Sequence, residues 1–339
     1  MDALSEVLGA IRLTGAVFLE MEVRGQWSYL TAPARKIADV LMPDADHVIP
    51  FHLVTHGTCY ARLVDGEPVA LRAGDLILFP MGDRHVLAAA SEPALRLKPL
   101  DLSGESLERL RRGDVAAFKK GGAGEATRVV CGYLACDKRL AEPILTSLPR
   151  LLKVSMQDDG TAAWVQSSIR YSVAESASAR PGSAAVLARL SEVLFAEAIR
   201  QYMDDLPSRK SGWLAGLKDR YVGRTLALLH EQPAYPWTVD KLARKVGLSR
   251  SALGERFTAL IGAPPMHYLA RWRTSLAATQ LRESNAPIIR VAEEVGYESE
   301  AAFNRAFKRE FGLPPAAWRK RAKRQVRADA GPSFGNGDA

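Results

Sequence analysis

Three histidines in the first quarter of the chain have side chains and a spacing that could hold a metal ion. His52 and His56 are four residues apart, which places both on one face of a regular β-strand. With His85, and with Cys59 as a further donor, they are candidates for a metal site or for an effector-sensing site. The alternative, which we favour, is that they are unligated histidines of the core or its rim. The sequence therefore predicts no bound cofactor.

The three cysteines, Cys59, Cys131 and Cys136, are too few and too odd in number for a disulfide framework. A thiol that senses oxidants must be an accessible thiolate near positive charge. Cys131 is the candidate for such a sensor, yet Arg128, and Lys138 beside Cys136, are the only local sources of charge in the sequence. We favour buried structural cysteines over a redox switch.

A second kind of chemistry, the reading of DNA bases, is indicated by polar side chains in the C-terminal third. Arginine can contact guanine through two hydrogen bonds, and asparagine can contact adenine in the same way. Arg250 stands at a helix end that usually meets base edges, whereas Lys308 lies further along its helix and is assigned to a phosphate. The candidate DNA-contacting residues are Arg250, Ser251, Glu255, Glu300, Asn304, Arg305 and Lys308.

These residues belong to a pattern that occurs twice, as "VGLSRSALGERF" from Val246 and as "VGYESEAAFNRAF" from Val295. In each copy a serine, Ser249 or Ser299, is a suitable N-cap for the helix that follows. Apolar residues four and eight positions after the serine form one buried stripe. They are Leu253 and Phe257 in the first copy, and Phe303 and Phe307 in the second.

Each copy is predicted to be a helix-turn-helix. Gly247 and Gly296 follow the last apolar residue of a shorter helix, where a left-handed residue is expected. Between the copies, residues 266–284 contain no internal proline or glycine and should form one helix of roughly 27 Å. Because one turn of DNA is about 34 Å long, the two copies could reach successive major grooves on one face.

Positive charge is concentrated in the same part of the chain. Residues 214–324 carry 20 Lys and Arg against 10 Asp and Glu, whereas the remainder carries 26 against 28. This local surplus indicates double-stranded DNA as a partner. The chain has no phosphate-binding loop, no glycine-rich dinucleotide motif and no zinc-finger spacing, so we do not expect an enzyme.

The region from about residue 213 to 321 resembles the AraC/XylS family of transcription regulators. The motifs are "WTVDKLARKVGLSRSALGERFTALIGAPPMHYL", "RWRTSLAATQLRES" and "PIIRVAEEVGYESEAAFNRAFKREFGLPPAAWRKR", which cover about a third of the chain. The resemblance implies a sequence-specific transcription regulator that acts as an activator, with RNA polymerase as a candidate partner. Glu255 stands where many members carry a polar or basic residue.

The N-terminal half resembles the cupin-like sensor domain of one subgroup of these regulators. "GDLILFPMGDRH", residues 74–85, fits G-x5-P-x-G-x2-H, a motif of cupin barrels, in which Gly74 and Gly82 make turns and Pro80 ends a strand. The cupin metal motif is eroded, because Thr58 stands where a second histidine would follow His56. The resemblance leaves two functions open: a regulator that senses a small molecule or a redox signal, and a metal-dependent cupin enzyme fused to a DNA-binding module.

We expect a two-domain chain in the cytoplasm, since no signal peptide or membrane-spanning run is present. The expected parts are a mainly-β cupin-like barrel with added helices (1–206), a linker (207–213), an all-α double helix-turn-helix domain (214–323) and a disordered tail (324–339). Helices are expected over residues 138–154, 162–178 and 184–204. The barrel or the last of these helices is a candidate for homodimerisation, and the effector is not identified by the sequence.

Overall fold

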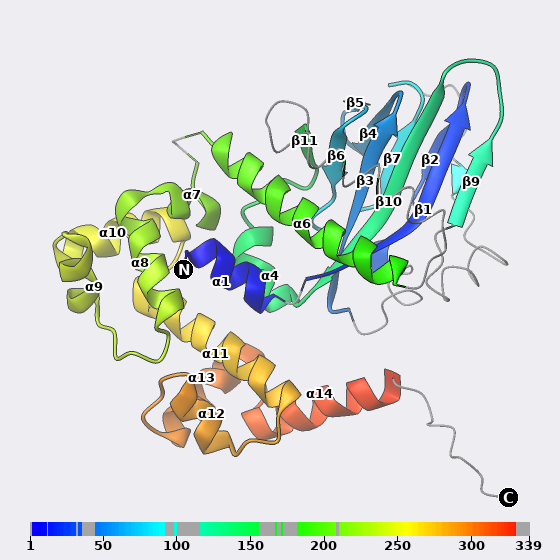
Figure 1. Ribbon diagram of the computed structural model, residues 1–339. Helices are drawn as coiled ribbons and strands as arrows, with labels where there is room; N and C mark the ends of the chain where they lie inside the picture. Colours follow the sequence, from blue (N-terminus) through cyan, green and yellow to red (C-terminus); the bar gives the residue numbers. More distant parts are fainter. Residues whose placement is uncertain are drawn as a thin grey trace, which may run out of the picture. The chain divides into compact units, whose positions relative to one another are not determined.

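The computed structural model describes residues 2–11, 13–31, 33–35, 45–91, 98–99, 116–155, 167, 171, 182–207 and 210–329. Contacts divide the chain into two compact units, one rich in strands and one helical (Figure 1). The strand-rich unit comprises Arg12–Lys138 and Leu148–Leu206, and the helical unit comprises Met1–Ile11, Arg139–Ser147 and Pro207–Ala339. One division falls at Leu206/Pro207, the limit that we expected, and two segments of the N-terminal half, Met1–Ile11 and Arg139–Ser147, group with the helices.

Two sheets form the strand-rich unit, and most of their neighbouring strands are antiparallel. The six-stranded sheet has the order β11-β6-β3-β10-β1-β9, with β1 (Thr14–Arg24), β3 (His47–His56), β6 (Asp75–Leu78), β9 (Ala116–Lys120), β10 (Ala126–Cys136) and β11 (Leu152–Ser155). The five-stranded sheet has the order β5-β4-β7-β2-β8, with β2 (Ser28–Leu30), β4 (Thr58–Leu63), β5 (Val69–Arg72), β7 (His85–Ala88) and β8 (Lys98–Pro99). Strand β11, which pairs with β6, replaces the end of the helix expected over residues 138–154.

One apolar core joins the two sheets, because alternate residues of each strand point to the same face. Met21 and Val129 of the six-stranded sheet and Ala61 and Leu87 of the five-stranded sheet belong to this core, together with Trp27. The turns predicted at Gly74 and Gly82 are confirmed by φ angles of 91° and 72°. Strands β4 and β5 pair as a hairpin around Asp65-Gly66. The expected mainly-β domain is therefore present.

A long helix, α6 (Ser183–Asp204), packs on β1 and confirms the helix predicted over residues 184–204 (Figure 1). The two elements approach closely at Gly15, where an added Cβ would clash with the Cβ of Ser191 and would lie 2.6 Å from the carbonyl oxygen of Ala188. Only glycine leaves room for the helix at this point. The helix expected over residues 162–178 lies outside the described residues, apart from Ser167 and Tyr171.

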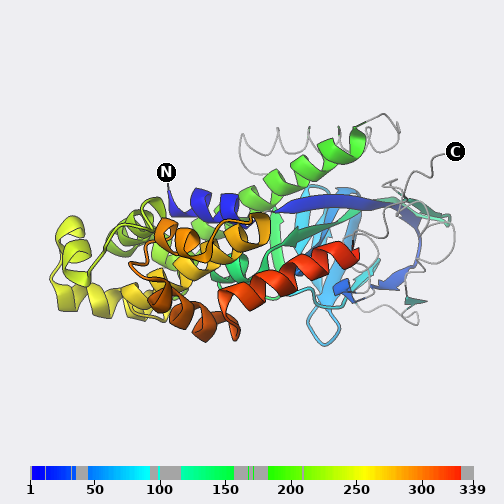
Figure 2. The same cartoon turned by 90° about the horizontal axis from the view of Figure 1, so that it is seen from below.

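In the second unit, the described residues form helices and the turns between them. Its helices are α1 (Ala3–Ala10), α4 (Lys138–Leu145), α7 (Trp213–Lys218), α8 (Arg220–Glu231), α9 (Val239–Val246), α10 (Arg250–Ile261), α11 (Pro265–Glu283), α12 (Ile288–Glu294), α13 (Glu300–Phe311) and α14 (Pro315–Asp329). Helix α1 packs on α8, and α14, red in Figure 2, packs on α11. Helix α14 continues to Asp329, so residues 324–329 are helical and do not belong to the disordered tail that we expected over 324–339; the rest of that range lies outside the described residues. None of the described helices is both long and apolar enough to cross a membrane.

Candidate nucleic-acid interface

The first helix-turn-helix consists of α9 and α10. Helix α9 ends at Gly247, whose φ of 80° lies in the left-handed region that glycine adopts without strain. Ser249 then caps α10, because its hydroxyl accepts a hydrogen bond of 3.2 Å from the backbone N–H of Ala252. Leu253 and Phe257 are completely buried. The cap, the turn and the inward stripe predicted for this copy are all confirmed.

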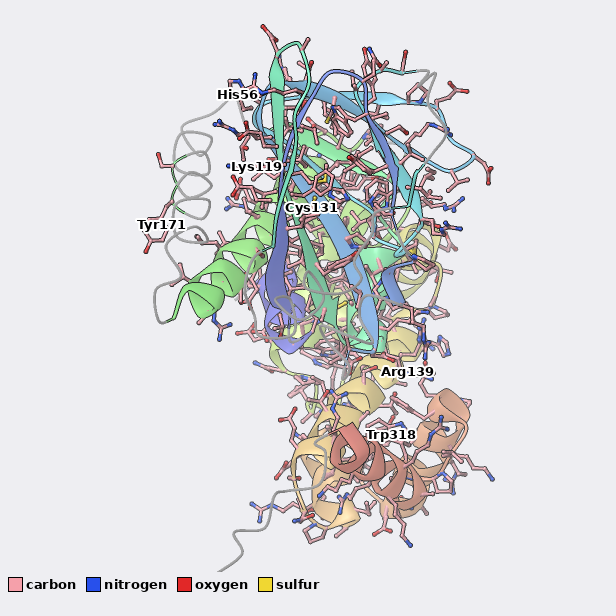
Figure 3. All side chains as sticks on the ribbon, turned by 90° about the vertical axis from the view of Figure 1, so that its right-hand side faces the viewer. His56, Lys119, Cys131, Arg139, Tyr171 and Trp318 are labelled. Atoms are coloured by element: carbon pink, nitrogen blue, oxygen red, sulfur yellow. The ribbon has the colours of Figure 1, made fainter. Side chains whose placement is uncertain are left out.

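The second helix-turn-helix, α12 and α13, repeats these features. Gly296 has a φ of 91°, and the hydroxyl of Ser299 accepts a hydrogen bond of 3.3 Å from the backbone N–H of Ala302. Phe303 and Phe307 are completely buried, as predicted. The ring of Phe307 stacks 4.3 Å from that of Phe311 and meets the edge of Trp318, which Figure 3 labels.

Burial of these stripes turns the opposite faces of α10 and α13 outward. Asn304 is half-buried, and the other six candidates are exposed. Within the described part of the chain, Arg305 and Lys308 form no ion pair. Two long, flexible cations are thus free to meet a polyanion. The contact of the seven residues with bases or phosphates stays a prediction; they are Arg250, Ser251, Glu255, Glu300, Asn304, Arg305 and Lys308.

Two arginines of α10 have different partners in the folded chain. Arg250 lies 3.2 Å from Asp240 of α9, and both side chains are exposed, so water screens this ion pair strongly. Arg256 instead donates to both carboxylate oxygens of Asp219, the N-cap of α8, at distances between 2.5 and 3.0 Å. These hydrogen bonds raise the pKa of Arg256. Arg256 therefore holds α10 against α8, whereas Arg250 can leave its partner at little cost.

A hydrogen-bonded chain of aromatic side chains fixes α7, α8 and α11 to one another. The indole N–H of Trp213 donates to the hydroxyl of Tyr268, which in turn lies 2.7 Å from Nε2 of His230. Burial lowers the pKa of His230 to about 3, so its imidazole is neutral and shares one hydrogen bond with the Tyr268 hydroxyl. This buried network keeps the helices behind the first helix-turn-helix in a fixed arrangement.

A short helix from the N-terminal half of the sequence also packs in this unit. Glu142 of α4 and Glu310 of α13 both pair with Arg271 of α11, the latter at 3.3 Å. Arg139 of α4 donates to the backbone carbonyl of Glu310 at 3.1 Å, and its guanidinium lies over the ring of Phe311. Helix α4 follows directly on β10, so the strand-rich unit continues into a helix that contacts the second helix-turn-helix.

Two of the three candidate metal-binding histidines are adjacent. The Nε2 atoms of His52 and His85 lie 2.6 Å apart, and Nδ1 of His85 lies 2.8 Å from the carbonyl oxygen of Asp83. Since a carbonyl can only accept, Nδ1 of His85 carries a proton and its Nε2 accepts from Nε2–H of His52. Burial lowers the pKa of His85 to about 4 and also lowers that of His52. The pair is therefore neutral and internally satisfied except at Nδ1 of His52, which is buried without a partner.

The third histidine, His56, does not join this pair. The β3–β10 register shifts between Val54 and His56, so Thr55 is an extra residue that reverses the alternation. His56 consequently faces solvent near the end of the strand, as Figure 3 shows. Our placement of His52 and His56 on one face assumed a regular strand and is wrong. Within the described residues, no three His, Cys, Asp or Glu side chains are arranged to hold a metal ion, so these residues do not fit the metal site of a cupin enzyme.

The cysteines lie in the core rather than in a reactive environment. Cys59 and Cys131 belong to the core between the sheets, where Figure 3 shows Cys131 among the strands, and Cys136 is buried as well. Burial raises the pKa of Cys59 and of Cys136 to about 12 and raises that of Cys131. Thiols in this state are poor nucleophiles, which supports the structural interpretation over the redox switch.

Sequence reasoning missed three residues that matter in this unit: Asp240, Arg139 and Glu142. Asp240 precedes its partner Arg250 by ten residues, across a turn, so neither helical spacing nor charge pattern indicates the pair. Arg139 and Glu142 lie well over a hundred residues from the groups that they contact. Charge alone does not single them out, because Lys138 of the same helix is charged as well.

Comparison with known proteins agrees with both units. A family model described as "Cupin" matches residues 2–204, and one described as "Helix-turn-helix domain" matches residues 242–321. The chain is 34% identical to a putative AraC-like transcription regulator of Streptomyces lividans, over 94% of this chain and 98% of that protein. It is 28% identical to the RCS-specific HTH-type transcriptional activator RclR of Escherichia coli, over 81% of this chain and 86% of that protein. Among solved structures, the DNA-binding domain of AdpA in complex with a target DNA is 28% identical and covers 34% of this chain and 100% of that chain, with a TM-score of 0.31.

Proposed function

The chain belongs to the AraC-like transcription regulators, and from that membership we propose that it reads a DNA site with α10 and α13 together and adjusts this binding to a signal received by its cupin unit. It carries an AraC-type DNA-binding domain and is a regulator rather than an enzyme. The observation that supports the two-helix reading most is the repetition of one capped, glycine-terminated geometry in α9–α10 and α12–α13.

The helix between the two copies has a suitable length for this reading. Helix α11 has 19 residues, which correspond to about 28 Å at about 1.5 Å per residue. One turn of DNA is about 34 Å, so helices at the two ends of α11 are spaced for neighbouring major-groove segments. In this proposal Arg250 and Arg305 contact bases, and Lys308 contacts a phosphate.

The continuity of β10 and α4 supports the sensing part of the proposal. Strand β10 carries Cys131 and pairs with β3, which carries His52, and its last residue is followed within two positions by α4. A rearrangement of the cupin core would thus reach Arg139 and Glu142, and through them Arg271 and α13. We assign the effector to the cupin unit, without naming its chemistry beyond a small molecule or a redox signal.

Activation of transcription, contact with RNA polymerase, homodimerisation and action in the cytoplasm complete the proposal. The named activator among the relatives supports activation, and family membership supports the other three. A metal-dependent enzyme is not retained, because His56 is separated from His52 and His85.

The DNA-reading part is tested by the genome-wide binding footprint of the full-length protein in its own cells. We expect a recurring sequence with two conserved blocks about one DNA turn apart, bound more tightly than scrambled DNA in vitro. Occupancy that follows only DNA abundance, with no recurring sequence, would contradict specific reading.

The sensing part is tested by replacing the residues of α4 that contact the second helix-turn-helix. Arg139→Ala and Glu142→Gln should change the affinity of full-length protein for its footprint DNA by about fivefold or more, although neither residue lies in a reading helix. Lys138→Ala is the matched control, because it removes an exposed charge from the same helix. Affinities equal to that of the control would show that α4 does not couple the units.

A further inference from the structure

Arg273, near the middle of α11, connects the two helix-turn-helix elements at a point away from the chain that links them. Its Nε donates to the carbonyl oxygen of Pro233 at 2.6 Å, and its Nη2 donates to that of Tyr235 at 2.8 Å. Both carbonyls belong to the loop that leads from α8 into α9, the first helix of the first element. The Cζ atom of Arg273 also lies 5.8 Å from the ring centroid of Tyr297, in the turn of the second element.

The same loop and turn touch directly at Gly296. A Cβ added there would lie 2.6 Å from Cα and 2.7 Å from the carbonyl oxygen of Ala234, and 2.8 Å from Nη2 of Arg273. Contacts this short are not tolerated between a Cβ and a backbone, so glycine allows the close approach. The two elements therefore meet at a second place, formed by the 233–235 loop, Arg273 and the Gly296 turn, which we call the bridge.

Only arginine can make the bridge in this form. A planar guanidinium donates through two nitrogens at fixed directions, which matches two carbonyl oxygens of one loop, and its flat face can stack on a ring. Burial lowers the pKa of Arg273, yet arginine stays charged in proteins and its hydrogen bonds are charge-assisted. A lysine would keep the charge but could not satisfy both carbonyls and the ring with the same geometry.

We propose that Arg273 is a positioning residue for DNA recognition, because the bridge fixes the angle and distance between α10 and α13 and so makes the protein accept one spacing between the two DNA segments. This inference rests on the proposed reading of DNA by both helices. A single base pair inserted between the segments moves one by about 3.4 Å and rotates it by about 36°. A rigid pair of readers cannot follow this displacement, whereas a pair joined by α11 alone could bend toward it.

The gain in affinity from binding two DNA segments at once depends on how well the spacing of the segments matches the spacing of α10 and α13. When the spacing matches, the second contact is intramolecular and strengthens binding by about 10²-fold or more. When it does not, this gain is lost. The bridge therefore converts a preference for two short sequences into a preference for two sequences at one distance.

The test selects bound duplexes from a random-sequence library with full-length wild-type protein, with Arg273→Lys and with Arg290→Lys. Arg290 is an exposed arginine of α12 that pairs with Glu294 of the same helix, so it controls for the change of residue type. We expect the wild type and Arg290→Lys to select two sequence blocks at one spacing. Arg273→Lys should select the same blocks at several spacings, and a one-base-pair insertion should weaken its binding by no more than about threefold, against about tenfold or more for the wild type.

Two measurements on the same samples keep the outcomes distinct. Thermal melts show whether Arg273→Lys is folded, and its salt dependence should equal that of the wild type, because the charge is conserved. If the wild type itself accepts several spacings, or if folded Arg273→Lys keeps the single wild-type spacing, the inference is overturned. If the wild type selects no second block, the two-helix reading fails instead. Even if Arg273→Lys does not fold, wild-type protein that accepts several spacings overturns the inference.

Discussion

Nη1 of Arg250, the first residue of α10, lies 3.2 Å from Oδ2 of Asp240 in α9. The pair is exposed on both sides and occupies an arginine that we assign to base contact. Under this assignment, Arg250 exchanges one carboxylate for a base edge when DNA binds. The exchange is inexpensive, because exposed ion pairs contribute only about 0.2–1 kcal/mol.

Asp240→Asn should strengthen DNA binding. The change frees Arg250 and removes one negative charge that faces the polyanion, so affinity for footprint DNA should rise about twofold to fivefold. Glu231→Gln removes an exposed acid from the end of α8 and is the control for net charge. Titrations at one fixed salt concentration measure both variants; a loss of affinity in Asp240→Asn would show that Asp240 positions Arg250 rather than restrains it.

The histidine pair predicts that the strand-rich unit loses stability in mild acid. The ordinary histidine pKa is 6.5, whereas that of folded His85 is about 4. Between these values the unfolded chain binds a proton that the folded chain does not, so stability is present above pH 6.5 and is lost as pH falls toward 4. The loss is at most about 1.4 kcal/mol per pH unit for each histidine.

Unfolding followed between pH 7 and pH 5 measures this dependence. His85→Gln can still accept from His52 and does not titrate, so its stability should fall less steeply than that of the wild type. His56→Gln, an exposed position, should behave as the wild type. The same steep fall in His85→Gln would refute the assignment to this imidazole.

Thiol chemistry separates the structural from the redox interpretation of the cysteines. With a pKa of about 12 for Cys59 and Cys136, and a raised pKa for Cys131, thiolate is scarce at pH 8. A colorimetric disulfide reagent should therefore leave the three thiols of the native protein unmodified and react with all of them in denaturant. Rapid reaction of Cys131 in the native state would support the interpretation of this cysteine as a redox sensor.

A structural feature could be predicted from the sequence when the residues that determine it lie close together in the chain. Ser249, Ser299 and Gly247 act within one turn of their own helices, so the double helix-turn-helix could be predicted residue by residue. His56 could not, because the bulge at Thr55 depends on how β3 pairs with β10, about seventy residues away. The sequence predicts helix where β11 lies for a similar reason, since a short apolar run does not reveal a pairing partner such as β6.

The interaction of the two helix-turn-helix elements lay beyond sequence reasoning altogether. In the sequence, Arg273 is one of several arginines on a basic helix. The groups that accept its hydrogen bonds are backbone carbonyls, which every residue has, so the sequence does not indicate which of them it contacts. The same holds for Arg139, whose acceptor is the carbonyl oxygen of Glu310. Contacts of this kind become visible only when the chain is folded.

A comparison of Arg305→Ala with Phe307→Ala shows whether α13 buries its phenylalanine stripe and reads DNA with the opposite face. Both full-length variants are titrated with footprint DNA and with scrambled DNA, and both are melted. Arg305→Ala should keep the wild-type melting temperature and lose about 1–3 kcal/mol on footprint DNA, with relaxed preference at one base position. Phe307→Ala should lose about 3–5 kcal/mol of stability, because Phe307 is completely buried. If Arg305→Ala melts early while Phe307→Ala stays folded and loses only specificity, the helix faces the other way and the account is contradicted.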